Sequence, residues 1–170
     1  MSKPRIFIAG IGNIFLGDDA FGSEVARRLQ LRDLPDDVQV VDFGIRGFDL
    51  AYALLEEYEV TILIDASPRG GEPGTLYTIQ PDLSELETDA RAVLLDAHDL
   101  NPMKVLTAVK AMGARFQRIL LIGCEPGTLE SEDGRLGLSE PVKLAVDEAI
   151  RVIESLVSKT LAETTSAAIS

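Results

Sequence analysis

A chain of 170 residues is the size of one compact domain, and its 46% hydrophobic and 26% charged residues are typical of a globular protein that buries a core. A formal net charge of −12 would repel phosphates, which argues against binding to nucleic acid or to anionic membrane surfaces. The longest apolar runs, such as 60–64, are too short to cross a bilayer, and the N-terminus lacks the pattern of a secretory signal. We therefore expect a cytoplasmic protein, and its size is compatible with a monomer.

Apolar runs of strand length alternate with segments of helical period, which predicts βαβ units and a largely parallel sheet. The predicted strands span residues 5–10, 38–42, 60–65, 74–79 and 118–123. The fourth of these is shorter and is expected to be an antiparallel edge strand. The predicted helices span residues 20–29, 48–58, 101–112 and the segment that follows Ser139. The expected fold class is α/β, a three-layer α/β/α sandwich with a five-stranded, mostly parallel twisted sheet.

Capping residues mark the starts of the last two helices. Asn101 is expected to be an N-cap, with Pro102 in the first turn, where its missing N–H costs nothing. Ser139 and Pro141 suggest the same arrangement for the final helix. From residue 158 the composition turns to Ser, Thr and Ala, with too little apolar surface to offset the entropy of ordering. Residues 1–157 are thus expected to form one domain and residues 158–170 a disordered tail.

Three aspartates follow the first three predicted strands. Asp19 lies beyond the glycine-rich turn after the first strand, and Asp42 and Asp65 end the second and third. One aspartate at a strand end is often only a cap or a turn residue. Three of them on neighbouring strands would converge at the sheet edge where α/β proteins bind ligands. Crowded carboxylates raise one another's pKa, so a cation or a basic group is expected among them.

The chain has one histidine, His98, just before the third long helix, and it should reach the same edge. Two carboxylates and one imidazole are a suitable set of ligands for a divalent metal that keeps open coordination positions. Such a metal could polarise a carbonyl and lower the pKa of a bound water for hydrolysis.

The glycine-rich turn also allows a dinucleotide interpretation, which would make the protein an oxidoreductase. The dinucleotide fingerprint needs a third glycine sooner than this sequence supplies one. The adjacent Asp18 and Asp19 would also repel a pyrophosphate from the helix N-terminus. One of these two aspartates is expected to cap that helix.

Other hydrolase sites match the sequence less well. A Ser–His–Asp triad would combine His98 with Ser67 or another serine, but no Gly-x-Ser-x-Gly elbow is present. A dyad of His98 with Cys124 is conceivable, although nothing near this single cysteine in the sequence lowers its pKa. A lone cysteine excludes an internal disulfide and a cysteine-rich zinc site, and there is no HExxH helix.

The ordered set of motifs from Arg5 to Leu156 resembles the nickel–iron hydrogenase maturation endopeptidases. The motifs are Gly-x-Gly-Asn with Gly-Asp-Asp-x-x-Gly in residues 10–22, Asp42 with Gly44, Asp65-Ala66, Pro73-Gly74, His98, Gly123-x-x-Pro126 and Leu138-Ser139-x-x-Val142. The resemblance implies a twisted mixed sheet of five strands flanked by helices, of the phosphorylase/hydrolase-like kind. It also implies that Asp19, Asp65 and His98 are the metal ligands. Phe43 departs from the pattern, because it replaces the first glycine of the family's Asp-Gly-Gly motif.

By this resemblance the chain would be an endopeptidase that removes a short C-terminal extension from the nickel-loaded large-subunit precursor of a nickel–iron hydrogenase. The metal would be the nickel that the precursor carries, with no organic cofactor. Asp19, Asp65 and His98 would act around the metal, and we expect Asp42 or a spare carboxylate to handle the proton. The alternative is a non-catalytic checkpoint that binds the same precursor without cutting it.

Overall fold

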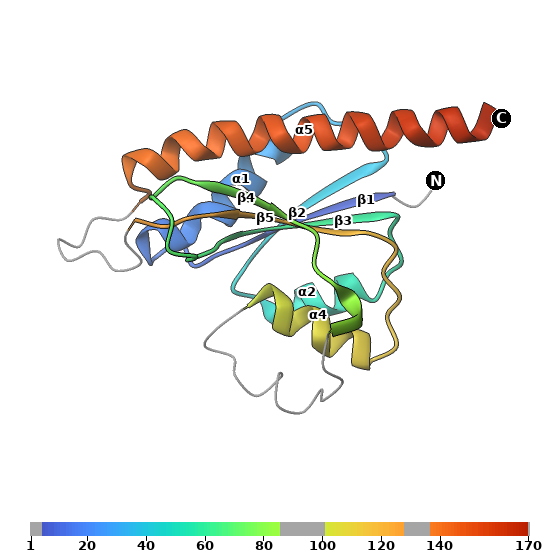
Figure 1. The fold of residues 1–170 in the computed structure, drawn as a ribbon, viewed down its shortest axis with the longest axis horizontal. Coiled ribbons are helices and arrows are strands. Elements are labelled where there is room, and N and C mark those ends of the chain that lie inside the picture. The colour runs from blue at the N-terminus through green and yellow to red at the C-terminus, as the bar shows by residue number, and fades with distance from the viewer. Residues whose placement is uncertain (1–4, 86–100, 128–136, 170) are drawn as a thin grey trace.

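The computed structural model describes residues 5–85, 101–127 and 137–169 (Figure 1). The strands are β1 (Ile6–Ile11), β2 (Val38–Gly44), β3 (Val60–Ala66), β4 (Leu76–Ile79) and β5 (Ile119–Cys124). The α-helices of the described residues are α1 (Phe21–Gln30), α2 (Gly47–Leu54), α4 (Pro102–Ala111) and α5 (Glu140–Ile169). Two short 3-10 helices, η1 (Gly17–Ala20) and η2 (Leu83–Glu85), complete the described elements. The predicted five strands and four long helices are confirmed.

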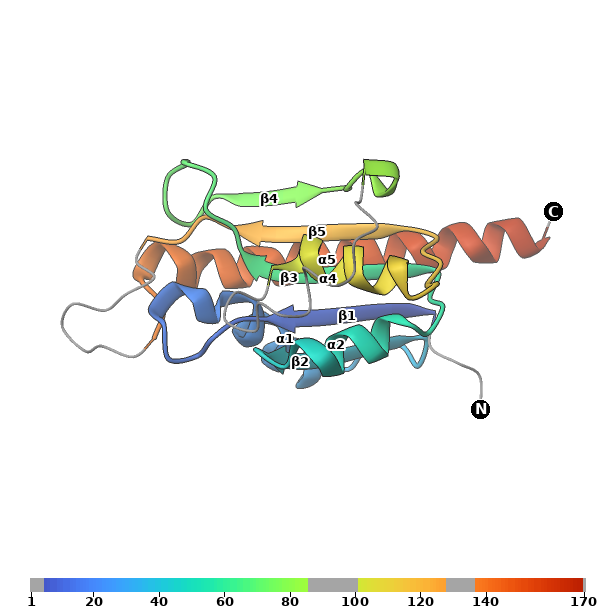
Figure 2. The same cartoon turned by 90° about the horizontal axis from the view of Figure 1, so that it is seen from below.

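The five strands form one sheet in the order β2-β1-β3-β5-β4, with a helical layer on each face (Figures 1 and 2). β1 is parallel to β2 and β3, and β3 is parallel to β5. β4 is antiparallel to β5 at one edge, as predicted. The carboxyl ends of β1, β2, β3 and β5 therefore lie along the same side of the sheet, where their loops can build one site.

Two apolar clusters fill the spaces between the layers. α1 and α5 pack on one face of the sheet, and their cluster includes Phe21, Leu29, Val146 and Ile150. α2 and α4 pack on the other face, with Leu50 and Leu106 in the second cluster. β1 is buried along its whole length because it lies between both layers, which explains why its sequence is apolar without alternation.

Glycines bring α1 unusually close to the sheet. A Cβ atom on Gly22 would lie 2.2 Å from the carbonyl oxygens of both Ile11 and Ile64. A Cβ on Gly10 would lie 2.3 Å from the carbonyl oxygen of Gly22 and 2.5 Å from Ala26 Cβ. The backbone of α1 thus rests directly on β1 and β3, which no side chain at these positions would allow.

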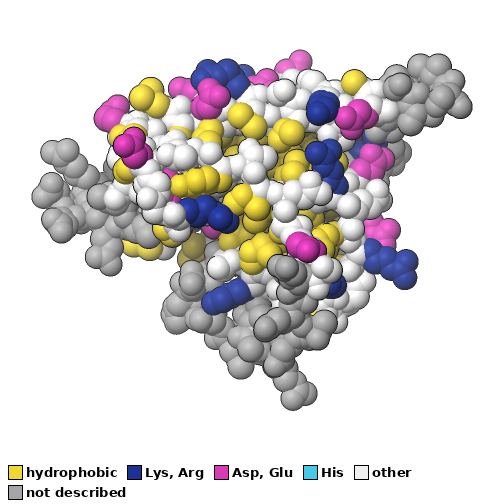
Figure 3. All heavy atoms as spheres, viewed as in Figure 1, with side chains coloured by type: hydrophobic (Ala, Val, Ile, Leu, Met, Phe, Trp, Pro, Cys, Tyr) yellow, Lys and Arg dark blue, Asp and Glu magenta, His cyan; other side chains and the backbone are white. Residues whose placement is uncertain are grey.

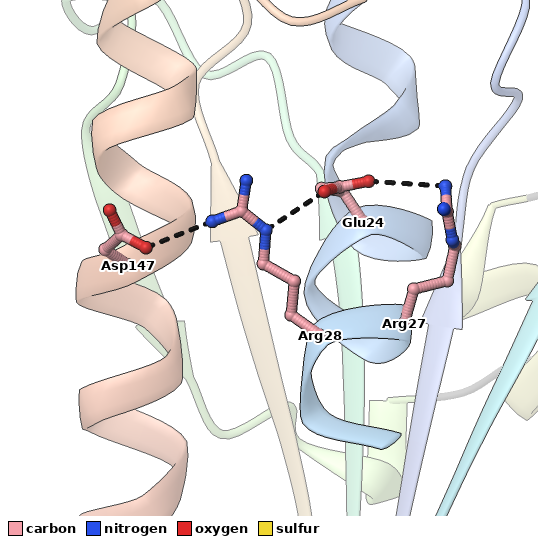
Figure 4. Close-up of polar contacts among 4 residues, drawn as sticks. All are labelled: Glu24, Arg27, Arg28 and Asp147. Carbon is pink, nitrogen blue, oxygen red and sulfur yellow. Dashed lines mark hydrogen bonds and ion pairs between the residues drawn. The ribbon is translucent and has the colours of Figure 1, made fainter. Parts of the chain in front are cut away.

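Charged side chains join α1 to α5 across the outer surface (Figure 4). Arg28 Nε lies 3.0 Å from Glu24 Oε1, and Arg28 Nη1 lies 3.1 Å from Asp147 Oδ1. Arg27 Nη1 lies 3.4 Å from Glu24 Oε2 and completes the network. Because these groups are largely exposed, each pair contributes at most about 1 kcal/mol. The apolar stripe of α5, buried against the sheet, holds the helix in place.

The helix α5 continues through Ile169, beyond the point where the sequence predicts a disordered tail. Leu161 still packs against the α1–α5 cluster, and the Thr160 hydroxyl donates to the Leu156 carbonyl at 2.8 Å. The contact of Leu161 with the core, together with the helix-favouring Lys, Leu, Ala and Glu of this segment, explains the difference.

On the face that Figure 3 shows, apolar side chains gather in the middle, and Lys, Arg, Asp and Glu side chains surround them. None of the helices in the described part of the chain is both long enough and apolar enough to cross a membrane.

Replacement of Gly22 by alanine should destabilise the fold, because the new methyl group would meet two strand carbonyls. Although Ala favours a helix by about 1 kcal/mol over Gly, overpacking of this severity should lower the free energy of unfolding by about 3 kcal/mol. Urea denaturation followed by circular dichroism measures the change. An unchanged midpoint would contradict the close contact between α1 and the sheet.

Candidate functional site

A pocket of about 680 Å³ opens at the carboxyl ends of β1, β3 and β5, beside the N-terminus of α4. Its described lining contains carboxylate, hydroxyl, amide and guanidinium groups together with apolar side chains. The polar members are Asn13, Asp19, Asp65, Ser67, Arg69 and Asn101. A large concave site with a few convergent polar groups is the expected form of an active site.

Asp19 and Asp65 lie together in this pocket, as the positions of their strands predict. Asp19 is on η1 and is half-buried, and its Oδ2 accepts a hydrogen bond of 2.9 Å from the backbone N–H of Asn13. The turn that carries Asp19 lies close against β1: a Cβ on Gly12 would be 2.1 Å from the Asp19 carbonyl oxygen. One oxygen of the Asp19 carboxylate is therefore held by a backbone N–H, and the Asp19 backbone itself packs against Gly12.

Asp65 is half-buried near the end of β3 and lies opposite Gly123 on β5. The buried carboxylate of Glu125, which follows β5, accepts two hydrogen bonds from the backbone N–H of Arg69, at 2.7 and 3.1 Å. The Arg69 side chain in turn donates to the Ser67 hydroxyl at 3.1 Å. Glu125 thus shapes the turn that carries Ser67 and Arg69 into the pocket.

Asp42 is not among the described residues that line the pocket. It is on β2, and its Oδ1 accepts a hydrogen bond of 3.0 Å from the backbone N–H of Gly44, whose φ is +58°. The preceding Phe43, which replaces the family glycine, is buried with its ring centroid 5.9 Å from that of Phe7. The Phe43 ring therefore fills space in the core on the α2 side of the sheet, where the family's glycine would have no side chain.

The third predicted ligand, His98, lies outside the described residues. Among the residues that the structure describes, no group of three or more His, Cys, Asp or Glu side chains is arranged to hold a metal ion. The two carboxylates, Asp19 and Asp65, supply the oxygen donors that divalent cations accept, so this part of the predicted set fits such an ion.

Asp18 has a different role from its neighbour Asp19. It is fully buried, and its carboxylate accepts hydrogen bonds from the Gly127 N–H (2.7 Å), the Ser139 N–H (2.7 Å) and the Ser139 hydroxyl (2.8 Å). The expectation that one of the two aspartates caps α1 is wrong, because Ala20 occupies the N-cap position and no side chain caps this helix. Asp18 instead ties the η1 turn to the segment after β5 and to the start of α5.

Cys124 is buried at the end of β5. Burial, with the nearby carboxylates of Asp18 and Glu125, raises the pKa of its thiol to about 12. A thiol with this pKa is protonated at neutral pH and is a poor nucleophile. The structure therefore disfavours the Cys124–His98 dyad.

Several lining residues were given no role in the site by the sequence analysis. Asn13 holds Asp19, and Arg69 is the one basic side chain in the described lining of the pocket. Arg69 follows β3 by three residues, so its place after a strand end was a usable signal. Asn101 was predicted only as the N-cap of α4, where its Oδ1 accepts a hydrogen bond of 2.9 Å from the Met103 N–H.

Comparisons with known proteins give one consistent result. The family model HycI, described as hydrogenase maturation protease, matches residues 23–156. A protein of Methanocaldococcus jannaschii, provisionally named as a hydrogenase maturation protease, is 36% identical over 163 residues, which are 94% of this chain and 100% of that protein. The hydrogenase expression/formation protein HupD of Rhizobium leguminosarum is 34% identical over 157 residues, 89% of this chain and 75% of the relative.

A solved structure has the same fold as this chain. The crystal structure of hydrogenase 2 maturation peptidase from a Thaumarchaeota archaeon superposes with a TM-score of 0.69 and 31% sequence identity. The superposition covers 91% of this chain and 98% of the other.

Replacement of Asp18 by alanine should destabilise the protein, because three donors would lose their charged acceptor. The free energy of unfolding should fall by about 3 kcal/mol. Asp49→Ala is the control, because this exposed aspartate makes only a 3.4 Å ion pair with Arg46 and should matter by less than about 0.5 kcal/mol. Equal stability of the two variants in urea denaturation would show that the Asp18 contacts are not needed.

The buried thiol of Cys124 should resist alkylation in the folded protein. At pH 8, which is well below its pKa of about 12, iodoacetamide should modify Cys124 only after unfolding in guanidinium. Mass spectrometry before and after unfolding measures the modification. Alkylation of the native protein at the rate of a free cysteine would contradict the assigned environment.

Proposed function

This chain belongs to the hydrogenase maturation protease family, and we propose that it removes a short C-terminal extension from the nickel-loaded large-subunit precursor of a nickel–iron hydrogenase. Membership of this family supports an activity that hydrolyses peptide bonds. The observation that carries the proposal is the presence of Asp19 and Asp65 in one pocket at the carboxyl ends of the strands. A chain end of the precursor would enter this pocket, and we expect the reaction to take place in the cytoplasm.

We propose that the nickel is part of the substrate. Asp19, Asp65 and His98 would contact the ion that the precursor already holds, and the protease would need no resident metal of its own. A pair of carboxylates presented without a full ligand cage suits the recognition of a metal with other ligands in place. Cleavage would then depend on nickel insertion, because a precursor without the ion would lack the group that the two carboxylates bind.

The polar groups of the pocket suggest how the chain would act on the precursor. Nickel held by the substrate would polarise the scissile carbonyl and acidify a bound water. The fixed carboxylate of Asp19 would hold the precursor's ion in register with the cleavage site. Arg69 would attract the carboxylate of an entering chain terminus, because it is the one basic group in the described lining.

Proton transfer is assigned to Asp42 in this proposal. Asp42 lies on β2, outside the described lining of the pocket, and its carboxylate is engaged with the Gly44 N–H. It would therefore take the proton of the attacking water through an intervening water molecule. We expect Asp42→Ala to slow cleavage without abolishing it.

The alternative is a checkpoint that binds the precursor and does not cut it. The same carboxylates would serve such a protein, but membership of a protease family favours the enzyme. The mass of the precursor separates the two functions, because only a protease shortens it.

Intact mass spectrometry of the nickel-loaded precursor from the same genome, before and after incubation with this protein, tests the proposal. We expect loss of a short C-terminal peptide with the wild type and with the control Asp49→Ala. We expect no loss with Asp19→Ala, Asp65→Ala or His98→Ala, because each would remove a group that contacts nickel.

The same assay on a precursor without nickel should give no product. Cleavage of this precursor at the normal rate would refute recognition of nickel. Unchanged mass despite stable binding of the loaded precursor would instead support the checkpoint.

A further inference from the structure

Large apolar side chains are exposed next to the pocket. Of the nine exposed large hydrophobic residues in the described part of the chain, six lie in two short segments. Ile14, Phe15 and Leu16 form the loop between β1 and η1, and Ile45, Phe48 and Tyr52 follow β2 and continue onto α2. We call these six residues the apolar rim. Single exposed apolar residues are common, but a concentration of this kind marks an interaction surface.

The two segments of the apolar rim begin side by side. β1 and β2 are neighbouring parallel strands, and Ile11 lies opposite Gly44 in their register. The hydrogen bond from the Gly12 N–H to the Gly44 carbonyl, 2.9 Å long, continues this pairing into the loops. Phe48 and Tyr52 are four residues apart on α2 and so share one side of that helix.

The apolar rim is continuous with the pocket. Leu16 and Ile45, one from each segment, are both part of the pocket lining that also contains Asp19 and Asp65. From these two residues the rim extends outward to Phe15, which is 70% exposed, Phe48 at 60% and Tyr52 at 68%. A molecule held in the pocket and extending beyond it would therefore meet these aromatic rings.

Backbone and side-chain contacts hold both segments in shape without burying their apolar residues. The Phe15 N–H donates to Asn13 Oδ1 at 2.9 Å, and the Leu16 N–H donates to the Asn13 carbonyl at 3.1 Å. In the second segment, Arg46 donates to the carbonyls of Phe43 and Asp42, at 3.2 and 2.7 Å. A surface fixed before binding loses little conformational entropy when a partner docks.

The position of the rim determines what can occupy it. A second copy of this chain on the rim would cover the pocket, and a small ligand in the pocket would not reach Phe48 or Tyr52. A folded protein whose chain end enters the pocket would leave the pocket in use and would also reach Phe48 and Tyr52. Aromatic side chains at the centre of an interface, with charged groups outside it, are typical of protein partners.

We propose that the apolar rim docks an apolar surface of the folded large-subunit precursor beside its C-terminal extension, so that recognition is shared between the rim and the pocket. The proposal rests on the proposed function and adds the surface through which the precursor is bound. The rim would raise the affinity for the whole precursor and leave the chemistry to the groups in the pocket.

The test compares Phe15→Ser and Phe48→Ser with the controls Leu31→Ser and Leu144→Ser. Leu31 is 88% exposed at the C-terminal end of α1, and Leu144 is 70% exposed on α5. Both lie on the helical layer that does not contain α2. We expect each rim variant to weaken binding of the nickel-loaded precursor about tenfold, by biolayer interferometry, and the controls to match the wild type. KM for cleavage should rise with little change in kcat, because docking precedes the chemical step.

Tyr52→Ser repeats the test at a rim position outside the described pocket lining, and circular dichroism confirms that all variants are folded. Rim variants that bind and cleave like the controls would overturn the docking surface, even if the wild type cuts the precursor. Precursor that binds through the rim but is not shortened would overturn the proposed function alone. A wild type that is dimeric by light scattering, with monomeric rim variants, would assign the rim to self-association and overturn its role in docking.

Discussion

The close contact between α1 and the sheet determines the form of the whole site. Because Gly10, Gly12 and Gly22 have no side chains, the backbone of the η1–α1 segment can lie against the ends of β1 and β3. This contact leaves only a short distance between the end of β1 and the start of α1, and η1 fits within it. As a result, two adjacent aspartates face different parts of the structure. Asp19 lines the pocket, and Asp18 bonds to the segments that contain Gly127 and Ser139. The contact of α1 with the sheet thus positions Asp19 in the candidate site and lets Asp18 tie the same turn to the start of α5.

The site combines rigid and exposed parts in a way that suits a large substrate. Asp19 and the turn at Ser67 and Arg69 are held by backbone hydrogen bonds, so their geometry is set before a substrate arrives. Apolar side chains stand outside this fixed centre and remain available to a partner. A small-molecule enzyme would gain nothing from exposed aromatic residues beside its pocket, whereas a protease for one folded protein needs contacts beyond the scissile bond to select it.

The sequence predicted the sheet well because buried parallel strands and strand-end aspartates leave strong local signals. Apolar runs located all five strands, and the positions of Asp19 and Asp65 after neighbouring strands correctly predicted that they share a pocket. Local signals failed where the decisive contact is distant in sequence. Asp18 looks like a helix cap, but its partners are more than 100 residues away. Asp42 follows the same pattern as Asp65, yet the turn at Gly44 engages its carboxylate. The composition of residues 158–170 predicts a disordered tail, whereas α5 continues through Ile169. Composition alone does not reveal that Leu161 packs against the α1–α5 cluster.

The position of α5 in the chain has a consequence for how the protein acquires its fold during synthesis. Val142, Val146, Ile150 and Ile153 belong to the cluster that covers one whole face of the sheet, and they come from the last described helix. Until that helix has left the ribosome, the apolar residues of β1, β3 and β5 on this face lack part of their cover. The strand pairs are also distant in sequence, since Thr61 of β3 pairs with Ile119 of β5. Stable folding must therefore follow translation of α5. The candidate site at the strand ends would therefore be held in its final form only after α5 has been synthesised and packed on the sheet.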